Sequence, residues 1–83
     1  MSTARTIHVR LFAILREQAG VSTLEVVTDA ATPVDLYREL QTQHALAFPL
    51  HLLRVSVNER YADPTTALAD GDRVVFIPPV AGG

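Results

Sequence analysis

The most constraining feature of this sequence is a short stretch, residues 73–77, that is apolar on both sides of a β-strand. Its sequence, Arg-Val-Val-Phe-Ile, places apolar side chains at odd and even positions alike, which is typical of a central strand. An Asp-Gly-Asp turn at residues 70–72 precedes it, and two prolines at residues 78–79 end it. Because a central strand needs a neighbour on each side, the rest of the chain must supply a sheet around it.

Three further stretches alternate between apolar and polar residues with a period of two, the pattern of a half-buried strand. They span residues 6–12, 22–28 and 53–57. The first two are joined by residues 13–20, which favour a short helix closed by glycine, and we expect these two strands to pair antiparallel. A turn at residues 58–59 follows the third strand.

The longest expected helix spans residues 32–44. Thr32 suits the N-cap, Pro33 suits the first helical position, and the acidic Asp35 favours the positive end of the helix dipole. One apolar stripe predicts that this helix covers a sheet. The residues of the stripe are Leu36, Tyr37 and Leu40, with Val34 at its margin.

The order of elements is therefore strand, strand, helix, strand, strand. It predicts an α+β roll in which one main helix, with a short second helix, covers a mixed sheet of four to five strands. The crossover makes the first and last strands neighbours at the centre of the sheet, an arrangement that fits the ubiquitin-like β-grasp fold. We expect a β-grasp domain over residues 1–77 and an extended C-terminal tail over residues 78–83.

The composition excludes several classes of function. The absence of cysteine rules out disulfides, thiolate zinc sites and thiol nucleophiles, and the three histidines show no metal-ligand spacing. A net charge of -2 argues against a nucleic-acid surface. No apolar run reaches the ~18 residues of a membrane helix, and no signal sequence precedes the first strand, so we expect a cytoplasmic protein. A chain of 83 residues is also too short to enclose a deep active site of its own.

The tail carries the most specific chemistry. It ends in Gly82-Gly83, in a chain with only four glycines. Pro78 and Pro79 favour an extended conformation that directs the tail up to ~20 Å from the sheet, and glycine lets a backbone enter a narrow cleft. The Gly83 carboxylate is ionised at neutral pH and needs activation before it can transfer a group. Adenylation followed by attack of a sulfur donor would give a thiocarboxylate, a sulfur nucleophile.

Five short segments match the pattern of a known family, and they are residues 9–13, 15–17, 57–59, 68–74 and 76–83. Together they resemble the small, sulfur-carrier subunits of molybdopterin synthases, in the MoaD/ThiS family of ubiquitin-like proteins. The Pro-Pro-Val-x-Gly-Gly ending is the most specific part. The resemblance implies that Gly83 is adenylated, is converted to a thiocarboxylate and donates its sulfur to cyclic pyranopterin monophosphate. Two such transfers build the dithiolene of molybdopterin.

The resemblance also implies a set of partners. An E1-like adenylyltransferase that uses ATP and Mg would activate the tail, and a separate donor protein would supply the sulfur. The large synthase subunit would provide the pterin pocket with any acid or base, within a heterotetramer. The chain itself would bind no cofactor, no metal, no nucleic acid and no membrane.

A partner-binding surface is expected beside the tail, on the side of the sheet that faces away from the main helix. In the resembling family, hydrophobic residues at positions like Phe12, Tyr61 and Ile77 meet both the activating enzyme and the large subunit. The full set of expected partner-binding residues is Phe12, Tyr61, Val75, Ile77, Pro78, Pro79, Val80 and Ala81.

Three other functions remain open from the sequence. A sulfur carrier for thiamin thiazole or for tRNA thiolation would use the same tail chemistry, although such carriers often lack the two prolines. A ubiquitin-like protein modifier would be conjugated to lysines through Gly83. A β-grasp interaction domain with an inert tail would not depend on Gly83 at all.

Overall fold

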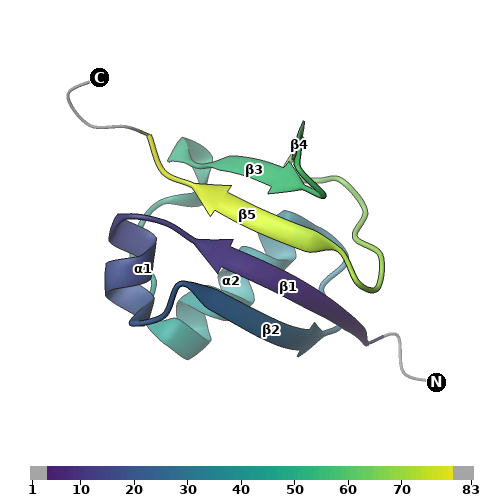
Figure 1. Cartoon of the computed structure of the whole chain (residues 1–83), viewed down its shortest axis with the longest axis horizontal. Helices are drawn as coiled ribbons and strands as arrows, with labels where there is room; N and C mark the ends of the chain where they lie inside the picture. The colour runs from purple at the N-terminus through teal and green to yellow at the C-terminus, as the bar shows by residue number, and fades with distance from the viewer. Residues whose placement is uncertain (1–3, 80–83) are drawn as a thin grey trace.

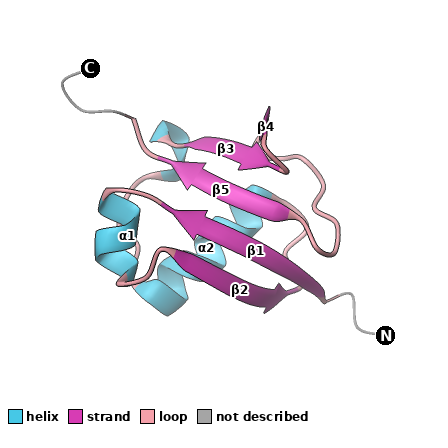
Figure 2. Ribbon diagram, in the orientation of Figure 1, coloured by secondary structure: helices cyan, strands magenta, loops and turns pink. Residues whose placement is uncertain are grey.

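The computed structural model describes residues 4–79, which form a five-stranded mixed sheet with its helices on one side (Figure 1). Figure 2 shows the main helix behind the sheet, so that the opposite sheet face is not covered by a helix. The strands are β1 (Arg5–Leu11), β2 (Thr23–Thr28), β3 (Arg54–Val57), β4 (Arg60–Ala62) and β5 (Arg73–Ile77). The helices are α1 (Ile14–Ala19), α2 (Pro33–His44) and the 3-10 turn η1 (Leu50–Leu52). This arrangement confirms the predicted β-grasp fold.

The strand order is β2-β1-β5-β3-β4, which puts β5 at the centre of the sheet as its sequence predicts. β5 runs parallel to β1 and antiparallel to β3, while β2 and β4 form antiparallel pairs at the two edges. Two elements were not predicted, namely η1 and the edge strand β4. Each has only three residues, too few to show a periodic pattern.

The hydrophobic core lies between α2 and the covered face of the sheet. Val74 and Phe76 of β5 are fully buried in it, whereas Val75 and Ile77, at the alternate positions, are partly exposed on the other face. The apolar stripe predicted for α2 is buried as expected. The core residues are Ile7, Val9, Leu11, Leu15, Val26, Ala30, Leu36, Tyr37, Leu40, Leu46, Leu53, Val55, Leu68, Val74 and Phe76.

The start of α2 and the end of α1 are where the sequence predicts them. The Thr32 side chain caps α2 by accepting a hydrogen bond of 3.3 Å from the backbone N–H of Asp35. Gly20 closes α1 in the left-handed conformation, with φ of 78°. Because α1 follows β1 directly, it lies at the same end of the sheet as the last residues of β5 (Figure 1).

The start of β5 is fixed by a hydrogen-bonded network around the Asp-Gly-Asp turn. Asp70 Oδ1 accepts a 2.7 Å hydrogen bond from the backbone N–H of Thr6 on β1. The Asn58 side chain donates to Asp72 Oδ1 and accepts from the backbone N–H of Arg73, both at 2.9 Å. Asp70 and Asp72 therefore anchor the predicted turn that leads into β5.

Candidate functional site

The open face of the sheet is the surface directed away from α2. It presents an apolar strip along β5 that consists of Val75 and Ile77. Strand register places Arg10 and Ser56 on either side of Val75, and it places Arg54 opposite Ile77. Tyr61 on β4 lies next in the row after Ser56. The register thus brings side chains of β1, β5, β3 and β4 together on the open face, near the end of β5.

Two of the predicted partner-binding residues are strongly exposed for their size. Tyr61 is 72% exposed and Phe12 is 39% exposed, while Val75 and Ile77 are partly exposed. All four belong to the open face or to the loop that continues β1. Exposed aromatic and aliphatic groups that gather in one place are typical of an interaction surface.

The two prolines after β5 differ in their surroundings. Pro78 is buried within this chain, whereas Pro79 is exposed. Pro78 therefore helps to hold the end of β5 against the domain, and Pro79 is the proline that a partner can reach. The remaining predicted site residues, Val80, Ala81, Gly82 and Gly83, lie outside the described residues.

Two arginines of the open face pack on aromatic rings. The guanidinium carbon of Arg10 lies 5.2 Å from the centroid of the Phe12 ring, and that of Arg54 lies 5.7 Å from the centroid of the Tyr61 ring. Such cation–π contacts stabilise both the charge and the orientation of the ring. Neither pair was predicted from the sequence, and the second depends on the register of the unpredicted strand β4.

Sequence reasoning also missed two exposed apolar residues near this surface. Ile14 opens α1 directly after β1, and Leu52 ends η1 shortly before β3; they are 36% and 50% exposed. Both segments lie at the end of the sheet where β5 ends (Figure 1). Neither residue belongs to an alternating stretch, so periodicity gave no reason to single it out.

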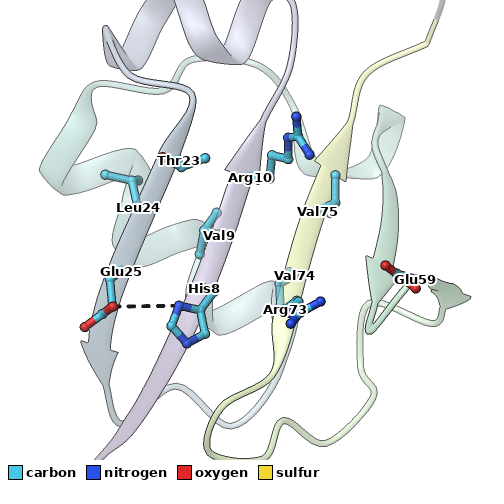
Figure 3. Close-up of a pocket in the computed structure, with 10 residues that line it drawn as sticks. All are labelled: His8, Val9, Arg10, Thr23, Leu24, Glu25, Glu59, Arg73, Val74 and Val75. Carbon is cyan, nitrogen blue, oxygen red and sulfur yellow. Dashed lines mark ion pairs between the residues drawn. The ribbon is translucent and has the colours of Figure 1, made fainter.

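A shallow groove runs along the open face between β2, β1 and β5, from the start of β5 as far as Val75 (Figure 3). Its polar lining includes His8, Arg10, Arg73 and Glu59, and His8 Nδ1 lies 3.8 Å from Glu25 Oε2. Over residues 4–79 no cluster of three potential metal ligands occurs. The groove is open to solvent on one side and shows no arrangement of a nucleophile with a base.

Two titratable groups have shifted pKa values, and both have structural explanations. Burial raises the pKa of Tyr37, which belongs to the core. Hydrogen bonds from the Thr65 hydroxyl and the Thr65 backbone N–H lower the pKa of Asp63, in the loop after β4. Tyr37 belongs to the core and Asp63 to a loop, so neither shift marks a group on the open face.

Comparison with known proteins decides the family. The sequence matches the ThiS family over residues 9–83, which is most of the chain. The chain belongs to the ThiS family. Among curated proteins, this ThiS-family chain is 38% identical over 80 residues to the molybdopterin synthase sulfur carrier subunit of Escherichia coli, covering 93% of this chain and 99% of that protein. The predicted family relationship is therefore confirmed.

Solved structures of two other proteins are similar to this ThiS-family domain. One is SAMP1, the small archaeal modifier protein 1 of Haloferax volcanii, with a TM-score of 0.77 and 30% identity over 94% of this chain and 99% of that chain. The other is a complex of subunits 1 and 2 of the molybdopterin-converting factor of Helicobacter pylori, with a TM-score of 0.67 and 28% identity over 94% of this chain and 99% of that chain.

None of the helices within residues 4–79 is long and apolar enough to cross a membrane.

Proposed function

We propose that this chain is the sulfur carrier subunit of a molybdopterin synthase. An E1-like enzyme adenylates Gly83 with ATP and Mg, and a sulfur donor then displaces AMP to leave a thiocarboxylate. The tail enters the large synthase subunit and transfers its sulfur to cyclic pyranopterin monophosphate. The large subunit provides the pterin pocket, and this chain binds no cofactor of its own.

The observation that carries this proposal is the continuity of the central strand with the tail. β5 is hydrogen-bonded to β1 and β3, and the buried Pro78 holds the chain at its end. The segment that follows contains the Pro-Val-Ala-Gly-Gly sequence of the tail. The strand is thus a rigid base from which residues 79–83 can reach a neighbouring protein, and the name of the E. coli relative supports a sulfur carrier.

Phe12, Tyr61, Val75, Ile77 and Pro79 would form the surface that meets the partners. Their exposed apolar side chains lie on the open face or adjoin the end of β5. In this proposal the domain comprises residues 1–77, and residues 78–83 act as the reactive arm. The Helicobacter pylori complex, which joins subunits 1 and 2, supports a large-subunit partner.

A second candidate function is protein modification through Gly83. It is favoured by the similarity to the small archaeal modifier protein 1 of Haloferax volcanii. The chain contains no lysine and so offers no side-chain amine on which chains of itself could be built. A modifier would be found in isopeptide bonds to other proteins, whereas a dedicated carrier would be found with a free thiocarboxylate.

Reconstitution separates these functions. The chain is incubated with the E1-like enzyme of the same organism, ATP, Mg and a sulfur donor, and then with the large subunit and cyclic pyranopterin monophosphate. We expect molybdopterin to form, and we expect one alanine added after Gly83 to abolish its formation. The matched control is one alanine added before Met1. Molybdopterin formation that survives the C-terminal addition would contradict the proposed chemistry, and lysine conjugates without molybdopterin would favour the modifier.

A further inference from the structure

The half of the open face nearest the tail holds two arginines that meet no carboxylate within residues 4–79. They are Arg10 on β1 and Arg54 on β3, and both are exposed. The ion pair present among the described residues, His8 with Glu25, involves neither of them. Each arginine instead packs on an aromatic ring, Arg10 on Phe12 and Arg54 on Tyr61.

These contacts leave the hydrogen-bonding edges of the guanidinium groups available. An arginine stacked on a ring keeps its planar fork of N–H donors, which matches the geometry of a carboxylate. Because the ring already restricts the side chain, less conformational entropy is lost when a partner binds it. Arg10 and Arg54 are therefore suited to donate hydrogen bonds to carboxylates of another protein.

The two arginines lie on opposite sides of the apolar strip. β1 and β3 are the two neighbours of β5, with Arg10 opposite Val75 and Arg54 opposite Ile77. Figure 3 shows Arg10 and Val75 nearer the end of β5, and it shows Glu25 paired with His8 nearer the start. The apolar strip thus has a cation on each side, close to where the tail leaves the domain.

This local charge differs in sign from that of the whole chain. The chain carries a net charge of -2, which by itself would repel an acidic partner. The acidic residues of the groove, Glu25 and Glu59, lie in the half of the face away from the tail. Arg73, at the start of β5, lies in that half too, so the half beside the tail is distinguished by arginines that pack on aromatic rings.

We propose that this half of the open face docks a surface of the large synthase subunit that presents carboxylates on both sides of an apolar side chain. The apolar group would contact Val75 and Ile77, and the carboxylates would pair with Arg10 and Arg54. This inference rests on the proposed function, because it takes the large subunit as the partner. It adds the chemistry by which that partner is selected, since complementary charges fix register and accelerate association.

Binding to the large subunit of the same organism tests the proposal. The dissociation constant is measured by titration calorimetry for the wild type, for Arg10→Glu, for Arg54→Glu and for the double variant. Arg38→Glu is the matched control, because Arg38 is exposed on α2, away from the open face, and makes the same change of charge. Thermal unfolding of each variant shows that the domain is intact.

We expect each reversal on the open face to weaken binding by about tenfold or more at low salt, and the double variant to weaken it further. The loss should shrink as salt is raised from about 0.05 to about 0.5 M, because exposed charges are screened. Arg10→Lys should retain part of the affinity, since it keeps the charge but not the planar fork. Arg38→Glu should bind almost as the wild type does.

Two results would overturn the proposal. Open-face reversals that bind no more weakly than Arg38→Glu would show that the arginines do not meet carboxylates. A loss of binding that is unchanged at high salt would assign the effect to packing rather than to charge. A wild-type chain that fails to bind the large subunit at all would instead contradict the proposed function, so the two failures are distinguishable.

Discussion

The ring of Tyr37 on α2 packs against the ring of Phe76 on β5, with centroids 5.0 Å apart and planes tilted by 55°. The Tyr37 hydroxyl also donates a 2.7 Å hydrogen bond to the carbonyl oxygen of Phe48, in the loop after α2. One side chain thus connects the main helix, the central strand and a loop. The contact thus anchors β5, the strand that precedes the tail, on the main helix.

Replacing Tyr37 with Phe should lower the free energy of unfolding by about 1–2 kcal/mol, because it removes the hydrogen bond to Phe48 and leaves the ring in place. Denaturant unfolding measures the change. Tyr61→Phe is the control, since Tyr61 is 72% exposed and its loss of a hydroxyl should leave stability almost unchanged. Equal stability of the Tyr37 variant and the wild type would show that this hydrogen bond contributes nothing.

Stability should also fall in alkaline solution because of Tyr37. Burial raises the pKa of this phenol above its ordinary value of 10.0, so the folded state holds the proton more tightly than the unfolded state does. The contribution of Tyr37 is therefore fully present below pH 10 and is lost as pH rises through the folded-state pKa. Denaturant unfolding as a function of pH should show this loss, and Tyr37→Phe should make it smaller. The same slope in both proteins would contradict the assignment.

Substitutions at the two residues of the turn between β3 and β4 should change the free energy of unfolding in opposite directions. Asn58 and Glu59 have φ values of 53° and 71°, as a two-residue type I′ hairpin turn requires. Asn58→Ala should cost about 1–3 kcal/mol of unfolding free energy, because it loses the hydrogen bonds to Asp72 and Arg73 at a left-handed position. Chemical denaturation checks this value.

Glu59→Gly should instead stabilise the domain by up to about 1 kcal/mol, since glycine adopts a positive φ without a steric penalty. The same denaturation measurement applies, and it needs no separate control because the two substitutions are neighbours with opposite expected signs. If Glu59→Gly destabilised the domain, the turn would not carry the backbone strain that its φ values indicate.

Much of this fold could be predicted from the sequence because its strands and main helix have long, regular patterns. The order of elements, with its crossover, and the two-sided apolarity of β5 were enough to predict that β1 and β5 are neighbours at the centre. β4 could not be predicted, because three residues carry no periodicity and their pairing depends on the turn at Asn58. Boundaries shifted by only one residue, as in β1, which ends at Leu11.

The alternation of β5 predicts two separable effects. Phe76→Ala should destabilise the domain by about 3–5 kcal/mol, because Phe76 is fully buried against Tyr37. Ile77→Asp should leave most of the stability and should weaken binding to the large subunit, because Ile77 is partly exposed on the open face. Unfolding and binding measurements on both variants check this separation. Unchanged binding by Ile77→Asp would remove the apolar strip from the proposed interface.

Less of the candidate site than of the fold could be predicted from the sequence. Residues of the alternating strands, such as Val75 and Ile77, could be assigned to the outer face from periodicity alone. The contact between Arg54 and Tyr61 could not, since it needs the register of β3 with β4. Nor could the different burial of Pro78 and Pro79, because two adjacent prolines have the same local preferences and only tertiary packing distinguishes them.

The most direct test of the account is the intact mass of the protein isolated from its native host, with the C-terminal peptide sequenced by tandem mass spectrometry. We predict a fraction in which sulfur replaces one oxygen of the Gly83 carboxylate. The account would be contradicted if Gly83 retained an unmodified carboxylate even after incubation with the activating enzyme, ATP and a sulfur donor. A Gly83–lysine isopeptide bond, found without the thiocarboxylate, would identify the chain as a modifier instead.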